Sequence, residues 1–202
     1  GFIGGMNIAQ RYIDQPHQHW RDLHLRVEGP SVGSLQRIFV SDWYFIKGSL
    51  LKDACYFPPY RSTSASKPTE GWVQMVSSNP VSRYPEIMFG LTWIIQHATQ
   101  HIYFQTPYFM PTDPISQALQ TAAMSGVDVR IMLPEKPDSF WLRWGNNSYI
   151  LPMLEAGVKI YEYTPGFVHA KVWTSDDEKG VVGTINLDYR SLYHHYECAT
   201  YM

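Results

Sequence analysis

Three stretches in the C-terminal half of the chain alternate hydrophobic and polar residues as β-strands do. They are residues 102–109 (IYFQTPYF), 127–133 (VDVRIML) and 158–163 (VKIYEY). Val, Ile, Tyr and Phe are frequent in them, and these side chains favour the pleated surface of a sheet. The first stretch contains Pro107, which cannot donate a ladder hydrogen bond, so we expect the strand to break there.

The apolar spacing changes to that of helices outside these strands. Residues 85–99 place five apolar side chains on one helical face, namely Ile87, Leu91, Ile94, Ile95 and Ala98. Another helical segment is expected in residues 139–157, which end at a glycine. Strands that alternate with helices predict an α/β fold, with a mostly parallel sheet and helices on both faces.

A helix is also predicted between the first two strands, where residues typical of helix ends stand on both sides. Asp113 is expected as its N-cap, Pro114 at its first helical position and Gly126 as its C-cap.

A short internal repeat divides the chain. GFIGGMNI at residues 1–8 aligns without gaps with GVVGTINL at residues 180–187, an offset of 179 residues. This distance suits two copies of one domain better than a solenoid repeat. We therefore expect residues 1–55 to be the tail of a first copy, residues 56–71 (rich in Pro, Ser and Thr) to be a linker, and residues 72–202 to form the second copy.

Composition and charge narrow the function classes. Hydrophobic residues make up 45% of the chain and charged residues 17%, as in an ordinary globular protein. The net charge of -2 gives no basic surface for nucleic acid, so no nucleic-acid partner is expected. No apolar run approaches the ~20 residues of a membrane span, and we expect the chain itself to be soluble. The two cysteines have no metal-ligand spacing, and neither a metal nor another cofactor is expected.

The candidate chemistry lies in residues 166–186. HAKVW has the composition of a strand, on which His169 and Lys171 would project from the same face. A histidine can act as nucleophile or as general acid and base, and an ammonium group beside it supplies fixed positive charge. Gly183 permits close backbone approach, and Asn186 offers an amide donor. Together these groups suit the oxygens of a phosphodiester.

The pattern His169-x-Lys171-x4-Asp176-x6-Gly183-Thr184-x-Asn186 resembles the HKD motif of the phospholipase D superfamily in every position. His-x-Lys alone is more often incidental, and the added Asp, Gly and Asn reverse that balance. Further stretches along nearly the whole chain resemble bacterial cardiolipin synthases, among them GGMNIAQRYI, WRDLHLRVEGPSV, IYFQTPYFMP, SGVDVRIMLPEKPD, MLEAGVKIYEY and NLDYRSL.

This resemblance implies a phospholipase D-like α-β-α sandwich in two copies, which meet at a shared site and give it one His, one Lys and one Asn each. The implied reaction passes the phosphatidyl group of one phosphatidylglycerol to another through a phosphohistidine, without metal, and releases glycerol. The partners would be phosphatidylglycerol or a related phospholipid and the membrane surface. The full-length protein would lie at the cell inner membrane, with its anchors outside this chain. The first copy's histidine is usually the nucleophile, which would leave His169 as general acid and then base, but the sequence leaves that order open.

The resemblance also implies roles for residues outside the motif. Glu197, 28 residues after His169, is expected to hydrogen-bond the His169 ring and fix its tautomer. Asp22 corresponds to Glu197 in the other copy, as Asn7 corresponds to Asn186. Asp22 would then orient a first-copy histidine, which this sequence does not contain.

Two more residues are assigned supporting roles. Asp176 is expected to be a structural anchor, because the motif aspartate usually sits outside the proton-transfer pair of the family. Tyr108 is expected to approach the site from the end of a strand, where α/β sheets bind ligands, and a plain core role for it is an equal alternative.

Two other functions stay open. One is a hydrolase, either a phospholipase D-type phosphodiesterase or a single-motif nuclease, in which the His169 side chains of two chains face each other in a homodimer. The other is a catalytically silent lipid-binding module. A second His-x-Lys-x4-Asp just upstream would favour transfer within one chain. With one histidine of the pair, residues 1–202 alone are expected to be inactive.

Overall fold

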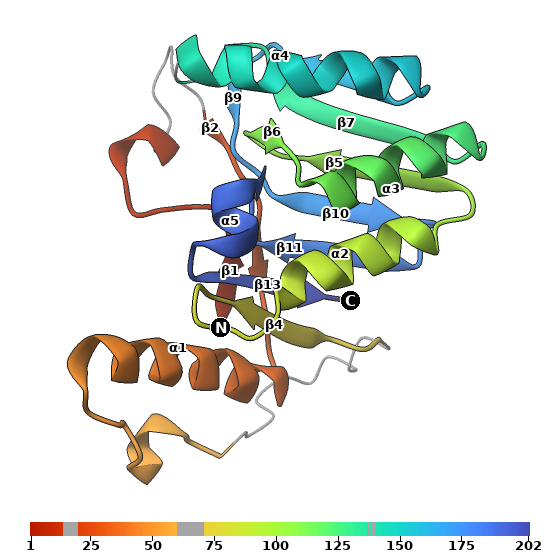
Figure 1. Cartoon of the computed structure of the whole chain (residues 1–202). Helices are drawn as coiled ribbons and strands as arrows, with labels where there is room; N and C mark the ends of the chain where they lie inside the picture. Colours follow the sequence, from red (N-terminus) through yellow and green to blue (C-terminus); the bar gives the residue numbers. More distant parts are fainter. Residues whose placement is uncertain (14–19, 60–70, 137, 139) are drawn as a thin grey trace.

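The computed structural model describes the whole chain except residues 14–19, 60–70, 137 and 139. Its centre is a sheet of seven strands (Figure 1). Across the sheet the order is β4 (Gln74–Ser78), β13 (Glu197–Tyr201), β11 (Lys179–Gly183), β10 (Val172–Ser175), β5 (His101–Gln105), β7 (Asp128–Pro134) and β8 (Lys159–Tyr163). The strands β5, β7 and β8 are those expected from the alternating pattern.

The α/β class is confirmed, but the sheet is mixed rather than mostly parallel. Only β5, β7 and β8 run parallel, whereas β4, β13, β11, β10 and β5 pair antiparallel. Parallel neighbours need crossover helices, and these leave a helical period in the sequence. The antiparallel pair β10–β11 is joined instead by a tight turn, in which Asp176 and Asp177 have φ of 56° and 58°. Such a turn leaves no helical signal.

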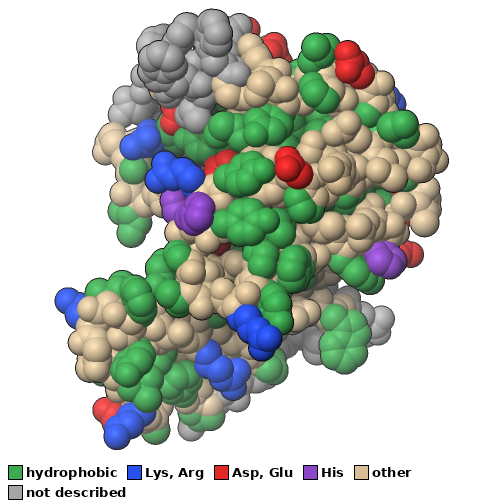
Figure 2. Space-filling view, viewed as in Figure 1, with side chains coloured by type: hydrophobic (Ala, Val, Ile, Leu, Met, Phe, Trp, Pro, Cys, Tyr) green, Lys and Arg blue, Asp and Glu red, His purple; other side chains and the backbone are tan. Residues whose placement is uncertain are grey.

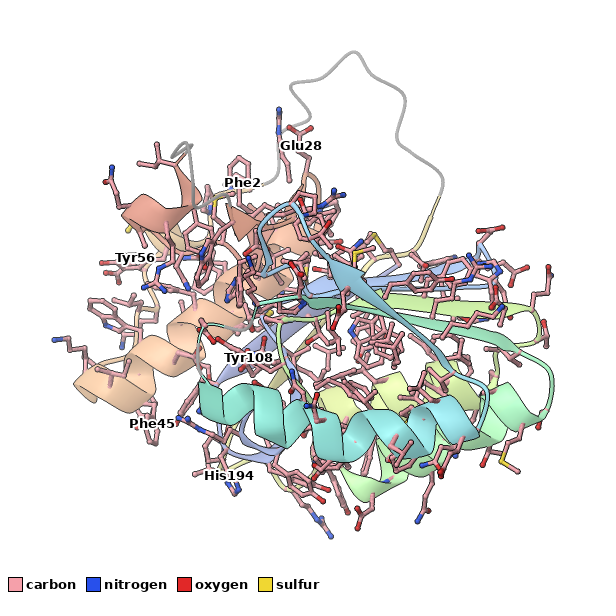
Figure 3. All side chains as sticks on the ribbon, turned by 90° about the horizontal axis from the view of Figure 1, so that it is seen from above. Phe2, Glu28, Phe45, Tyr56, Tyr108 and His194 are labelled. Carbon is pink, nitrogen blue, oxygen red and sulfur yellow. The ribbon has the colours of Figure 1, made fainter. Side chains whose placement is uncertain are left out.

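Helices cover one face of the sheet. On that face, α2 (Glu86–Gln96), α3 (Asp113–Met124) and α4 (Phe140–Glu155) cover a core in which Ile102 and Ile131 are fully buried. Helix α1 (Ser31–Lys47) contacts β4, the edge strand, and lies beyond that edge of the sheet (Figure 1). Figure 3 shows α4 on one side of the sheet and the N-terminal residues Phe2 and Glu28 on the other.

The ends of α3 differ from the sequence prediction by one residue each. Its N-cap is Thr112, in an extended conformation, and Asp113 is already helical. Pro114 is tolerated at the second helical position because none of the first-turn N–H groups has an intrahelical partner. At the other end Ser125 is the C-cap, and Gly126 follows it with φ of 95°.

Two antiparallel strand pairs have the same register, at the two positions of the internal repeat. In the pair of β1 (Phe2–Gly4) and β3 (His24–Arg26), Gly4 lies opposite His24. In the pair β11–β13, Gly183 lies opposite Ala199. At each glycine a β-carbon would stand 2.8 Å from the Cα atom of its opposite residue. Only glycine fits so close an approach, so the repeat extends from sequence to backbone geometry.

These two pairs pack against each other, because β1 contacts β11 and β13, and β3 contacts β11. The proposed copy boundaries stay a prediction. Of the expected linker, residues 60–70 lie outside the described residues, and η2 (Ala54–Tyr56) precedes them.

Short elements gather at the end of the sheet toward which β5 and β7 point (Figure 1). There β2 (Trp20–Arg21) pairs with β9 (Phe167–Val168), and β6 (Phe109–Met110) pairs with β12 (Leu187–Asp188), both in parallel. The helical turns η1 (Gln10–Tyr12) and α5 (Tyr189–Tyr193) lie at the same end.

The surface is rich in apolar side chains around α1. Figure 2 shows hydrophobic, Lys and Arg side chains together on the lobe that α1 and the residues after it form. The end of α1 exposes Tyr44, Phe45 and Ile46 beside Lys47. Among the described residues, no helix is both long and apolar enough to cross a membrane.

Candidate active site

The imidazole of His169 is held by a carboxylate from the N-terminal part of the chain. Pairing of β2 with β9 brings Arg21 beside Val168, and the His169 amide donates to the Arg21 carbonyl at 2.7 Å. The next residue, Asp22, therefore reaches the ring, and its Oδ2 lies 2.7 Å from Nδ1 of His169. Gly5 makes room for this carboxylate, because a β-carbon there would stand 2.6 Å from Asp22 Oδ1.

Asp22, not Glu197, is thus the carboxylate partner of His169. The expected assignment of Glu197 to this ring differs from the structure, in which Glu197 accepts a hydrogen bond from the Thr184 hydroxyl. Asp22 and Glu197 are nevertheless equivalent, because each lies two residues before the residue opposite Gly4 or Gly183. The two strand pairs pack together so that the acid next to one pair contacts the histidine that precedes the other pair. Sequence spacing within one copy cannot reveal such a contact.

The Lys171 ammonium lies against the same imidazole. Its Nζ is 2.9 Å from Nδ1 and 3.0 Å from Nε2 of His169, and it donates to the His169 carbonyl at 2.6 Å. Burial lowers the pKa of Lys171 to about 8, against the opposing charges of Asp22, Glu197 and Asp188. The amine is therefore still mostly protonated at neutral pH, and it supplies positive charge at the ring.

His169 and Lys171 share a site without forming the expected continuous strand. Residues 169–171 lie in the break between β9, which pairs with β2, and β10, which pairs with β5 and β11. The chain changes sheets at this point, and the two side chains still meet.

The two motif asparagines make matching contacts. Asn186 Nδ2 donates to Ser191 Oγ at 3.3 Å, and Asn7 Nδ2 donates to the Tyr12 hydroxyl at 3.4 Å. The Oδ1 atom of Asn186 is buried and has no partner among the described residues. A half-turn of this amide would let it accept from Ser191 and present its NH₂ group to a bound oxygen.

Glu197 occupies a buried position near Lys171. Burial raises its pKa to about 7, while hydrogen bonding by Thr184 and Ser191 and the charge of Lys171 act in the opposite direction. His195 Nδ1 lies 3.6 Å from its carboxylate. Glu197 thus has hydroxyl and cationic neighbours, as Asp22 does.

Asp176 lies away from the imidazole, in the β10–β11 turn. Its carboxylate accepts from the amides of Thr99, Gln100 and His101 at 2.8, 2.9 and 2.9 Å. Partial burial acts to raise its pKa, but these hydrogen bonds outweigh it and hold the pKa at about 2. The contacts are those of an anchor between the turn and the start of β5.

Tyr108 stands at the end of β5 and points to the residues before α4. Its hydroxyl donates to Asp138 Oδ2 at 2.8 Å, and burial together with this carboxylate raises its pKa. Tyr108 is labelled in Figure 3 at this end of the sheet. Among the described residues, no hydrogen bond joins Tyr108 to His169, and the role of Tyr108 stays a prediction.

Sequence reasoning missed the aromatic surroundings of His169. The Tyr12 hydroxyl lies 3.1 Å from Nδ1, and the rings of Tyr12 and Trp20 lie 5.7 and 5.2 Å from the imidazole. The Arg11 guanidinium stacks over Trp20 at 4.8 Å. The one available signal was the repeat, since Tyr12 follows Asn7 by five residues, as Ser191 follows Asn186.

The arrangement favours chemistry at Nε2 of His169. Asp22 and Tyr12 lie at Nδ1 and orient the ring at that atom, whereas the one described neighbour of Nε2 is the Lys171 ammonium, 3.0 Å away. Lys171 adds the charge that a phosphate oxygen requires. Within the described ranges, no group of three or more His, Cys, Asp or Glu side chains could hold a metal ion.

Comparison with known proteins agrees with this geometry. The family model described as "Cardiolipin synthase, PLD-like domain" matches residues 91–202. The cardiolipin synthase of Alkalihalophilus pseudofirmus is 40% identical over all of this chain, which covers 40% of that protein. Cardiolipin synthase 2 of Bacillus anthracis is 38% identical over all of this chain, which covers 39% of it. The chain thus spans about two fifths of the length of these relatives.

Solved structures share the fold. Nuc of Salmonella typhimurium, a phospholipase D family member, superposes with a TM-score of 0.54 at 21% identity, over 64% of this chain and 81% of that one. NucT of Helicobacter pylori gives a TM-score of 0.50 at 17% identity, over 64% of this chain and 85% of that one.

Proposed function

The chain belongs to the cardiolipin synthase family of phospholipase D-like proteins, and we propose that it carries half of a phosphatidyl-transfer site. In the full-length protein this site would join two phosphatidylglycerol molecules into cardiolipin and release glycerol. The pairing of His169 with Asp22 is the observation that carries the proposal, because it fixes Nδ1 against a carboxylate and leaves Nε2 beside the Lys171 ammonium, where a phosphate would be held.

The second histidine of the reaction comes from the first copy, upstream of this chain in the full-length protein. By the repeat, it would lie beside Glu197 as His169 lies beside Asp22. A site of two such halves would have two imidazoles, two ammonium groups and two asparagine amides around one phosphate. These groups neutralise phosphate charge while the bonds to phosphorus change. No metal cofactor is part of the proposal.

The reaction divides into two balanced steps. First, Nε2 of one histidine bonds to phosphorus, the bond from phosphorus to the glycerol oxygen breaks, and the other histidine donates its proton to that oxygen. Then a hydroxyl oxygen of a second phosphatidylglycerol bonds to phosphorus, the phosphorus–nitrogen bond breaks, and the histidine that lost its proton takes the hydroxyl proton. We assign the attack to the first copy's histidine, and the proton transfers to His169.

The proposal places the full-length protein at the inner membrane, because both substrates are lipids of that bilayer. Their headgroups reach a protein site only where the protein meets the membrane surface. The anchors would lie outside this chain.

The full-length protein, incubated with phosphatidylglycerol in detergent micelles, tests the proposal. We expect cardiolipin and glycerol in equal amounts. Phosphatidic acid with glycerol, and no cardiolipin, would identify a hydrolase of the phospholipase D type instead. The absence of any product, with lipid still bound, would identify a lipid-binding module.

A further inference from the structure

Among the described residues, Tyr12 is the one whose hydroxyl hydrogen-bonds the His169 ring. Its oxygen is 3.1 Å from Nδ1, and the two rings meet edge to face with an interplanar angle of 73°. Trp20 packs against both rings, at 5.5 Å from Tyr12 and 5.2 Å from His169. The phenol is thus fixed in place by packing, not only by its hydrogen bonds.

The direction of the hydrogen bonds at Tyr12 follows from its neighbours. The phenol oxygen accepts a hydrogen bond from the Asn7 side chain at 3.4 Å. Hydrogen bonding by the side chain and the backbone N–H of Asn7 acts to lower the pKa of Tyr12. A hydroxyl has two acceptor positions and one proton, so these bonds leave the Tyr12 proton for another acceptor. Nδ1 of His169 lies within reach. Burial and the charge of Asp22 raise the Tyr12 pKa, which keeps the phenol protonated.

The repeat places a second hydroxyl at the equivalent position. Tyr12 follows Asn7 by five residues, and Ser191 follows Asn186 by five. The hydrogen bond from the asparagine to this hydroxyl occurs in both copies, at 3.4 and 3.3 Å. Hydrogen bonding by the Ser191 side chain also acts to lower the pKa of Glu197, which is the equivalent of Asp22.

Resting on the proposed function, we propose that Tyr12 and Ser191 are equivalent positioning residues, each linking the motif asparagine of one copy to the catalytic histidine of the other. Tyr12 reaches Nδ1 of His169 directly, because a phenol is long. Ser191 is short, so it acts on the second histidine through Glu197. The two histidines therefore stand in different surroundings within a repeat that is otherwise symmetric.

At His169, the three groups near Nδ1 favour different proton positions, and the Lys171 ammonium, 2.9 Å away, can only donate to a bare nitrogen, as Tyr12 does. The Asp22 carboxylate accepts from an Nδ1–H group, whereas the Tyr12 hydroxyl donates to a bare Nδ1 and so favours the proton on Nε2. Tyr12 thereby holds a share of the neutral imidazole in the tautomer whose Nε2–H points at the bound phosphodiester. Deletion of the hydroxyl alone should shift this balance toward Nδ1–H.

Tyr12→Phe tests the proposal, because it removes the hydroxyl and keeps the ring that packs on Trp20 and His169. Tyr44→Phe is the matched control, since Tyr44 is an exposed tyrosine on α1. Nitrogen NMR of the His169 ring in residues 1–202, assigned with His169→Gln, reports the tautomer directly. We expect the Nδ1 and Nε2 resonances to move toward the Nδ1–H form in Tyr12→Phe and to stay in place in Tyr44→Phe.

Kinetics of the full-length protein give the second readout. Loss of one hydrogen bond of this kind should lower kcat about three- to tenfold in Tyr12→Phe, with KM for phosphatidylglycerol unchanged. Ser191→Ala should lower kcat by a similar factor without moving the His169 resonances. Unchanged His169 resonances in Tyr12→Phe would overturn the proposal, and so would an unchanged kcat.

The two readouts also separate this inference from the proposed function. If the unaltered full-length protein made no cardiolipin, the proposed function would fail. The resonances of Tyr12→Phe and Tyr44→Phe would then still decide whether Tyr12 positions His169.

Discussion

Asp22 and His169 are separated by 147 residues in the sequence, and their side chains meet at 2.7 Å. The contact joins a carboxylate of one copy of the repeat to the motif histidine of the other. Tyr12, Trp20 and Asp22 thus contribute to the surroundings of a motif that begins at residue 169. On the predicted division into two copies, the site lies between them and draws groups from both.

Replacement of His169 tests the role of the imidazole. We expect His169→Ala to lower cardiolipin formation by the full-length protein by several orders of magnitude, because loss of an acid–base group or nucleophile costs that much. A detergent-micelle assay measures the rate. His97→Ala, at an exposed histidine stacked on Trp93 at the end of α2, is the control and should keep the parent rate. More than a tenth of the parent rate in His169→Ala would rule out this role.

Lys171 is expected to act by charge and not by packing. Residue Lys171 is 3% exposed. Lys171→Met keeps most of its buried aliphatic volume and removes the ammonium group. Turnover in the full-length protein should fall at least a hundredfold, because a phosphate oxygen loses a charged donor in a buried site. Circular dichroism should show an unchanged fold. A folded variant with the parent turnover would show that Lys171 only fills space.

Asp176 is expected to matter for stability and not for chemistry. Asp176→Ala removes the acceptor of three backbone N–H groups and leaves alanine at φ of 56°. Unfolding in urea should show a loss of about 1–3 kcal/mol. The folded variant should retain its turnover within about twofold in the full-length protein. A large loss of turnover with unchanged stability would place Asp176 in the reaction instead.

Glu197 should make the stability of the chain depend on pH. Its pKa is raised from 4.5 to about 7 in the folded state, so the folded protein binds the proton more tightly than the unfolded chain does. Stability from this group is therefore greatest below about pH 4.5 and declines as the pH rises to about 7, by roughly 3 kcal/mol in total. Lys171, whose pKa is lowered from 10.5 to about 8, makes the stability depend on pH only above about pH 8, where it makes stability rise with pH.

Urea unfolding of residues 1–202 and of Glu197→Gln, compared from pH 4.5 to 7.5, isolates this contribution. The parent should lose stability relative to the variant as the pH rises. Parallel curves for the two proteins would mean that the carboxyl of Glu197 titrates normally and is not desolvated.

The sequence predicted the parts of the fold that carry a regular period. β5, β7 and β8 alternate in polarity, and α2 shows one apolar face, so their types and approximate bounds follow from the pattern. The antiparallel half of the sheet was missed because β10 and β11 are joined by a tight turn, and because β4, β13 and β5 pair with strands far from them in the sequence. The ends of α3 were misplaced by one residue, because a first-turn proline fits at either of the first two positions.

The candidate site divides in the same way. His169, Lys171 and Asn186 follow from their spacing in the motif, although residues 169–171 lie between β9 and β10 and not on a continuous strand. The partner of His169 depends on how two strand pairs pack, and no period in the sequence encodes that packing. The choice of Asp22 over Glu197, and the presence of Tyr12 at the ring, therefore appeared only in three dimensions.

The most direct test of the shared site is a transfer assay on residues 1–202 with radiolabelled phosphatidylglycerol, alone and mixed with a purified upstream part of the protein. Attack by one histidine and proton donation by another require both halves, so the chain alone should form no labelled cardiolipin. The mixture should form it, and His169→Ala in this chain should abolish it. Product formation by residues 1–202 alone, lost in His169→Ala, would contradict this account, because two His169 side chains would then complete the site in a homodimer.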